Sequence, residues 1–199
     1  MQMKYFLLYI LLQSRCVITS AQEAKQERPA KKGCSCSFSS IIQIGALTGS
    51  KGAETGIQTV NGLRYKTWFA GIGIGLDYYS IKSYPFFLDV RKDLFDQPST
   101  PFVYVDAGIH MPAKRKIMEG DWYANEYSNE FYSDAGVGYK IAMGKVSKML
   151  ISAGYSYKKV DRLYRFLPST GCDFAPCYQN HYNYVSWLHR FSVKMGWQF

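Results

Sequence analysis

The most regular feature of the chain is an alternation of apolar residues with polar residues or glycine, which runs from about residue 38 to the C-terminus. Between Trp68 and Tyr79 the even positions carry Trp, Ala, Ile, Ile, Leu and Tyr, whereas the odd positions carry Phe, three Gly, Asp and Tyr. A period of two residues is typical of a β-strand, in which successive side chains point to opposite faces. The segment therefore predicts a strand with one apolar face and one face of small and charged residues.

The same alternation recurs in five further segments, 86–94, 102–111, 131–141, 149–158 and 187–199. Lys92 interrupts the apolar face of its segment near one end, where a lysine at a membrane interface would extend its amine toward water. Two weaker candidates, 39–48 and 56–65, alternate poorly, and Asn61-Gly62 in the second is a candidate turn or bulge. The pattern thus predicts eight strands.

These strands are long enough to cross a membrane at a tilt. Connections near residues 66–67, 96–101 and 143–147 are short, whereas those at 112–127 and 166–180 are long. We therefore predict an all-β fold, an eight-stranded antiparallel up-and-down transmembrane β-barrel with short periplasmic turns and longer extracellular loops. The alternative is a soluble lipocalin-like ligand-binding barrel, which would place its apolar face inside.

The N-terminus has the features of an export signal. Lys4 precedes an apolar run at 5–12 that is too short to span a bilayer, and Thr19-Ser20-Ala21 offers small residues for cleavage. We predict a signal peptide at 1–21, a flexible polar lead-in at 22–37 and a transmembrane β-barrel domain at 38–199, exported to the bacterial outer membrane. A lipoprotein signal ending at Cys16 is the alternative, which Arg15 disfavours.

Four cysteines follow the predicted signal peptide. Cys172 and Cys177 enclose four residues that include a proline, and the exported context favours a disulfide between them. Free thiols or metal ligation are the alternatives. Cys34 and Cys36 are too close for an unstrained mutual bridge. We expect them in the flexible lead-in, where each could form a disulfide with another chain.

The chain is basic, with 24 Lys and Arg against 15 Asp and Glu and a formal net charge of +9. The predicted signal peptide contains two cations, Lys4 and Arg15, and no anion, so its removal leaves +7. An exported barrel would not meet nucleic acid routinely, so none is expected as a partner. Outer-membrane lipid and the phosphates of lipopolysaccharide are the expected counter-ions for cations in the predicted loops, Lys114, Arg115, Lys116, Arg162 and Arg165.

The predicted inward face carries charges of both signs, and an eight-stranded barrel is only wide enough to hold its own side chains. We therefore predict a charge-paired plug that leaves the lumen largely closed. A conduit for protons, ions or small solutes is the alternative. The lumen charge network comprises Arg64, Asp77, Asp89, Arg91, Asp93, Asp106, Asp134, Lys140, Lys158, Arg190 and Lys194.

We predict no catalytic, cofactor-binding or metal-binding residues. Ser186, His189 and Ser192 suggest a catalytic set, but parity places His189 on the opposite face from both serines. His110 and His181 lie near strand ends as candidate bases, yet no serine elbow, HExxH or phosphate loop accompanies them. An enzyme that acts on outer-membrane lipids remains an alternative function.

Several segments together resemble small outer-membrane β-barrel proteins of Bacteroidota, the outer membrane protein beta-barrel domain family with OmpA/OmpX-like barrels. They are the signal peptide and the segments 61–65, 85–91, 102–108 and 196–199. Such barrels serve as anchors, adhesins, small channels or lipid enzymes, so the resemblance specifies architecture more than function. It also implies that the terminal aromatics Trp197 and Phe199 form a signal that the outer-membrane assembly machinery reads.

The predicted function is that of a membrane scaffold whose surface loops contact the envelope or a partner. The two long loops contain aromatic residues that could contact an extracellular protein or glycan partner. They are Trp122, Tyr123, Tyr127, Phe174 and Tyr178. A small solute or ion channel is the alternative within the same fold.

Overall fold

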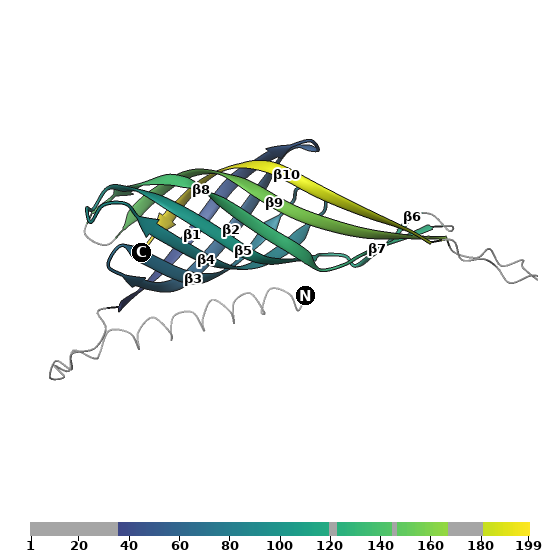
Figure 1. The fold of residues 1–199 in the computed structure, drawn as a ribbon, viewed down its shortest axis with the longest axis horizontal. Helices are drawn as coiled ribbons and strands as arrows, with labels where there is room; N and C mark the ends of the chain where they lie inside the picture. Colours follow the sequence, from purple (N-terminus) through teal and green to yellow (C-terminus); the bar gives the residue numbers. More distant parts are fainter. Residues whose placement is uncertain (1–35, 120–122, 145–146, 167–180) are drawn as a thin grey trace, which may run out of the picture. The chain divides into compact units, whose positions relative to one another are not determined.

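The computed structural model describes residues 36–119, 123–144, 147–166 and 181–199 (Figure 1). Ten strands form one antiparallel sheet in this part of the chain. No helix of the described residues is long and apolar enough to cross a membrane. The strands are β1 (Cys36–Gly49), β2 (Gly52–Tyr65), β3 (Trp68–Asp77), β4 (Ser83–Asp93), β5 (Thr100–Pro112), β6 (Lys116–Glu119), β7 (Tyr123–Tyr127), β8 (Glu130–Ala142), β9 (Lys148–Phe166) and β10 (His181–Gln198).

Eight of these strands close into a barrel. Strands β1 to β5, β8, β9 and β10 pair in that order, and β10 pairs with both β9 and β1. The closing seam runs from Ile41 opposite Gln198 to Gly49 opposite Arg190. The main-chain hydrogen-bonding groups of β1 and β10 pair along this seam, so no sheet edge remains there. The predicted eight-stranded antiparallel barrel is confirmed.

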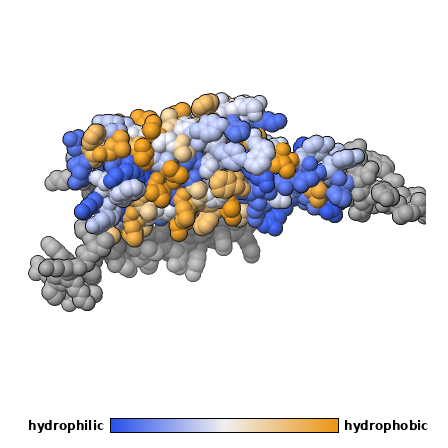
Figure 2. Space-filling view, viewed as in Figure 1, coloured by the Kyte–Doolittle hydropathy of each residue, from blue (hydrophilic) through white to orange (hydrophobic). Residues whose placement is uncertain are grey.

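Side chains alternate between lumen and outer wall as the sequence pattern predicts. In β4 the inward Phe87, Asp89 and Arg91 are at most 2% exposed, whereas the outward Phe86 and Leu88 are 45% and 62% exposed. Figure 2 shows apolar side chains spread over the visible wall of the barrel. The polarity is thus inverted relative to a soluble barrel, which excludes the lipocalin-like alternative for this fold.

Strands β9 and β10 continue past the rim of the barrel. They are 19 and 18 residues long, and β1 ends at Gly49, opposite Arg190, so the first nine residues of β10 lie beyond the seam. Strand β7 pairs with the distal part of β9, and β6 pairs with β7. The result is a four-stranded sheet in the order β6, β7, β9, β10, which we call the sheet extension (Figure 1).

The Asn61-Gly62 pair is neither a turn nor a bulge. It lies inside β2, where Asn61 is opposite Ser40 of β1 and Ile72 of β3, and the register is continuous on both sides. A side chain at position 62 would run into the carbonyl oxygen of Ala70, so glycine permits close approach of the strands here. The local turn preference is therefore overridden by pairing with two neighbouring strands.

The connections at the extension end of the barrel differ from the expected set of long loops. β1 and β2 are joined by only two residues, 50–51, and β3 and β4 by residues 78–82. The predicted loop at 112–127 contains β6 and β7, because its main chain pairs with β9 instead of remaining irregular. Long connections at this end are therefore confined to the β5–β8 and β9–β10 links.

Cys36 is the first residue of β1, opposite Tyr65 of β2, instead of lying in the flexible lead-in. Strand pairing thus begins two residues before the expected start of the barrel domain. The predicted Cys172–Cys177 disulfide lies outside the described residues, as do Cys34, the signal peptide, Trp122, Phe174 and Tyr178.

The C-terminal residue completes the seam. Phe199 and Ser40 exchange main-chain hydrogen bonds of 3.0 and 2.8 Å, and the Phe199 side chain is 48% exposed on the outer wall. Phe199→Ala keeps both main-chain bonds and removes the aromatic ring. If the ring is an assembly signal, this variant lowers the amount of barrel assembled in cells severalfold, while the free energy of unfolding of refolded protein falls by less than about 1 kcal/mol.

Deleting Phe199 supplies the comparison, because it also removes the two main-chain bonds and should cost refolded protein about 1–3 kcal/mol. Cell fractionation and urea unfolding in detergent measure the two quantities. Unchanged assembly of Phe199→Ala in cells would contradict the signal and leave the ring a packing role.

Candidate functional site

The lumen of the barrel concentrates the charged side chains. Ten of the eleven predicted lumen residues are buried. The Arg64 side chain is 21% exposed at the end of the barrel opposite the sheet extension, which we call the turn end. They form three clusters along the barrel, each with direct ion pairs. The clusters are the extension-end cluster (Asp77, Lys158, Arg190), the central cluster (Asp89, Arg91, Asp106, Asp134, Lys194) and the turn-end cluster (Arg64, Asp93, Lys140).

In the extension-end cluster one carboxylate serves two cations. Asp77, the last residue of β3, accepts hydrogen bonds from Arg190 Nη1 at 2.6 Å and Lys158 Nζ at 3.2 Å. Its Oδ1 accepts a further bond from the Tyr79 amide at 2.8 Å. Arg190 also donates to Ser156 Oγ at 2.6 Å and lies over the Tyr79 ring, 5.3 Å from its centroid. Desolvated charges of this kind are tolerated only when neighbouring groups supply such partners.

The central cluster contains a row of three carboxylates. Asp89, Asp106 and Asp134 occupy directly opposed positions on β4, β5 and β8. Opposed side chains in a sheet have Cβ atoms about 4.5–5.5 Å apart, and like charges there repel. The row therefore needs cations close by.

Two cations of the central cluster form ion pairs with the carboxylates of this row. Arg91 binds both oxygens of Asp89 at 2.6–3.0 Å, and Lys194 lies between Asp106 and Asp134 at 3.4 and 3.1 Å. Asp134 also accepts a hydrogen bond from Tyr104 Oη at 2.8 Å. Every carboxylate of the row thus has a cation in contact, although Asp106 Oδ1 has no hydrogen-bond partner.

In the turn-end cluster Asp93 again serves two cations, Arg64 Nη2 at 2.8 Å and Lys140 Nζ at 2.7 Å. The lumen network as a whole has five aspartates and six cations, so it is close to electrical balance. This balance allows so many charges to occupy a low-dielectric interior.

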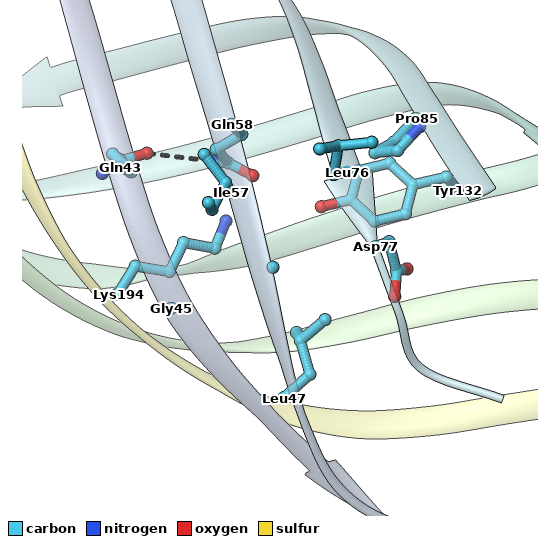
Figure 3. Close-up of a pocket in the computed structure, with 11 residues that line it drawn as sticks. Gln43, Gly45, Leu47, Ile57, Gln58, Leu76, Asp77, Pro85, Tyr132 and Lys194 are labelled. Atoms are coloured by element: carbon cyan, nitrogen blue, oxygen red, sulfur yellow. Dashed lines mark hydrogen bonds between the residues drawn. The ribbon is translucent and has the colours of Figure 1, made fainter. Parts of the chain in front are cut away.

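Buried side chains pack between these clusters. A cavity of only about 30 Å³ lies between Gln43, Gln58, Asp77, Tyr132 and Lys194 (Figure 3). Gln58 donates to Gln43 Oε1 at 2.8 Å, and Arg91 donates to the same oxygen at 3.0 Å. A cavity of this size has room for one or two water molecules. Apolar rings, among them Phe87, Phe102 and Tyr132, pack around the charges.

Sequence reasoning missed several neutral partners of the network. Ser156, Ser192 and Tyr104 lie on inward positions of well-patterned strands, so parity was sufficient to find them. Gln43 and Gln58 lie on the two strands whose alternation is poor, and they carried no clear signal.

The candidate catalytic residues do not come together. His189 points outward, where its Nδ1 is 2.6 Å from Tyr155 Oη, whereas Ser192 points inward and donates to Asp134 at 3.2 Å. His110 is buried, with Nε2 against the carbonyl oxygen of Lys159. Ser186 is exposed on the sheet extension. Within the described residues, no group of three or more His, Cys, Asp or Glu side chains is placed to hold a metal ion.

The outer wall carries lysine–aromatic pairs at both ends of the barrel. At the turn end Lys92 lies 4.7 Å from the ring centroid of Trp68 and donates to Thr67 Oγ1 at 2.6 Å. At the extension end Lys82 lies 5.3 Å from the ring centroid of Tyr78. Lys66–Tyr65 and Lys159–Trp187 repeat the arrangement at 5.5 and 5.7 Å. Tyrosine and tryptophan with snorkelling lysines are typical of membrane–water interfaces.

The spacing of these pairs defines an apolar band. Tyr78, directly after β3, is ten positions from Trp68 at the start of that strand, and the outward Trp197 is ten positions from Trp187 on β10. Ten strand residues rise about 33 Å, which at a tilt of about 40° is about 25 Å along the barrel axis. An apolar band of about 25 Å is the height found in transmembrane β-barrels.

Among solved structures the chain is similar to the crystal structure of Neisserial surface protein A (NspA), with a TM-score of 0.54 and 13% identity over 82% of this chain and 97% of that one. It is also similar to the outer membrane protein AlkL, whose structure was determined by solid-state NMR in DMPC lipid bilayers. That match has a TM-score of 0.51 and 11% identity over 88% of this chain and 95% of the other. No family model and no curated protein matches the chain. The fold is therefore that of small outer-membrane eight-stranded β-barrels.

The ion pairs make a testable distinction between the lumen and the sheet extension. Asp77→Ala leaves Arg190 and Lys158 buried without their carboxylate, so it should lower the free energy of unfolding by about 3–5 kcal/mol. Glu126→Ala removes an exposed partner of Arg165, 3.4 Å away on the extension, and should cost less than about 1 kcal/mol. Urea unfolding of both variants in the same detergent measures the difference. Similar small losses would mean that water screens the lumen.

Proposed function

We propose that the chain is an outer-membrane protein that anchors the sheet extension at the cell surface and whose lumen does not conduct. The observation that carries this proposal is the combination of an apolar outer wall with a lumen filled by paired charges. Membrane residence is supported by the 25 Å band between the lysine–aromatic pairs and by the fold shared with AlkL and NspA. Export by the predicted signal peptide at 1–21 would bring the chain to this location.

The closed lumen is supported by three successive barriers along the barrel axis. Each of the three charge clusters spans the lumen, because its members come from strands on different sides, for example Asp77 on β3 and Arg190 on β10. A solute that passed would have to separate these pairs without replacing their hydrogen bonds, which is costly in a low-dielectric interior. The cavity of about 30 Å³ between Gln43, Tyr132 and Lys194 is large enough for one or two water molecules only. These features favour a scaffold over the channel alternative.

The anchoring role is supported by the structure of the extension. Strands β9 and β10 run without a break from the membrane band into the extension, so the barrel holds it rigidly. Cations on and beside the extension include Lys114, Arg115, Lys116 and Arg162, which are exposed, and Arg165, which is paired with Glu126. We infer that lipopolysaccharide phosphates are their counter-ions in the membrane, and that a partner protein or glycan is met farther out.

The outer wall provides the test of membrane residence. Ile72 is 52% exposed and lies near the middle of the apolar band, so Ile72→Arg should lower the free energy of unfolding in phospholipid vesicles by about 2–4 kcal/mol. Met118 on β6 is 54% exposed but lies on the extension, so Met118→Arg should cost less than about 1 kcal/mol. Equal costs at the two positions, or wild-type protein recovered from the soluble periplasm without detergent, would contradict the proposal.

Conductance tests the closed lumen directly. Purified wild-type protein in a planar bilayer should pass little current, because the three clusters fill the lumen. Arg91→Ala serves as the comparison, since Arg91 is a lumen residue of the central cluster and touches no lipid. A stable, ion-selective wild-type conductance that Arg91→Ala changes would show that ions pass through the lumen, and the channel alternative would replace the scaffold.

A further inference from the structure

The sheet extension has two outer edges, and they differ in their protection. One edge is β6, which is only four residues long and begins with Lys116. The other is the distal part of β10, residues 181–189, whose sequence His-Tyr-Asn-Tyr-Val-Ser-Trp-Leu-His contains no Lys, Arg, Asp, Glu, Pro or Gly. Proteins ordinarily protect exposed edges with short length, charges, prolines or bulges. The β6 edge follows this rule, and the β10 edge follows none of it.

The main-chain groups of the β10 edge can be assigned from the seam. Phe199 exchanges both main-chain bonds with Ser40 of β1, so its N–H and C=O point to the β1 side of β10. Because the register of β10 is continuous and these directions alternate, Asn183, Val185 and Trp187 point to the same side. Strand β1 ends at Gly49, opposite Arg190, so no described strand pairs with these three residues on that side.

The side chains beside this edge are uncharged: Tyr184, Val185 and Trp187 are aromatic or β-branched, and the polar Asn183 and Ser186 lie among them. Tyr184 and Val185 are 52% and 44% exposed, and Trp187 is 56% exposed. The charged residues opposite this stretch, Lys159, Asp161 and Arg162, lie on β9, on the side of β10 away from the edge. Arg162 is 5.7 Å from the ring centroid of Tyr184. A neighbouring strand rich in β-branched or aromatic residues pairs well with such a surface, whereas a charged strand gains nothing from it.

We propose that the β10 edge at residues 183–187 binds an extended, uncharged polypeptide segment of a partner protein, which adds to the sheet in the place where β1 would lie if it continued. The main-chain groups of Asn183, Val185 and Trp187 supply the hydrogen bonds, as in other cases of strand addition. The inference rests on the proposed surface-anchoring function and names the partner chemistry of the extension.

The two sets of amides on β10 give the binding a specific signature. A synthetic peptide of alternating threonine and valine with a lysine at each end serves as the probe, added to the full chain in detergent micelles. It should slow hydrogen exchange of the Asn183, Val185 and Trp187 amides by at least about tenfold. The amides of Tyr184 and Ser186 already pair with β9 and should change little. The same peptide methylated on alternate main-chain nitrogens should bind at least about tenfold more weakly.

Val185→Pro removes one edge N–H without touching the β9–β10 ladder, and proline is tolerated on edge strands. It should weaken peptide binding by at least about tenfold, whereas Val185→Thr keeps the N–H and should bind within about twofold of wild type. Equal binding of the methylated peptide, uniform exchange protection, or a dimer formed through this edge that excludes the peptide would overturn the proposal. Correct membrane insertion without peptide binding would overturn this inference alone, whereas peptide binding by a protein that fails the vesicle test would overturn only the membrane anchor.

Discussion

The narrow lumen is the constraint on which the rest of this structure depends. Eight strands enclose a space only wide enough for side chains, so every inward charge must be neutralised by a group close to it, either on its own strand, as for Arg91 and Asp89, or across the lumen. The three clusters meet this requirement with few members. Asp77 and Asp93 each bind two cations, and Lys194 lies between two aspartates. Pairs between strands distant in sequence, such as Asp77 and Arg190, also favour the register in which the sheet closes.

The outer wall is apolar because the charged side chains face the lumen. Main-chain groups in hydrocarbon must all be satisfied within the protein, which a closed sheet achieves and an open one does not. Closure at the β10–β1 seam therefore permits the apolar wall to face lipid, and the lysine–aromatic pairs set its two limits ten residues apart. Where the sheet passes beyond the band, water can satisfy an edge, so the extension is free to remain open.

The architecture was predictable from the sequence because a period of two is a strong signal when one face is apolar over ten residues. It identified six strands well and assigned Asp89, Arg91 and Arg190 to the lumen. The specific ion pairs were not predictable, since they depend on how the closed sheet staggers its strands. The prediction of a turn or bulge at Asn61-Gly62 was wrong, because local turn preference carries no information about pairing with β1 and β3. The strands β6 and β7 were missed because each is too short to show a period.

Two regions of β10 differ in sequence and in pairing, and the difference supports a binding role for the edge at residues 183–187. Below Arg190, β10 has β1 on one side and β9 on the other, and its inward residues serve the charge network. In residues 181–189 the described partner strand is β9, and the sequence contains no charged residue while it keeps aromatic and β-branched residues. A segment exposed to water would ordinarily gain charges, which favour solubility and prevent edge pairing. Their absence from residues 181–186, which lie beyond the apolar band that ends at Trp187, is the pattern expected where an additional strand is accepted instead of excluded, since the β6 edge beside it is short and begins with lysine.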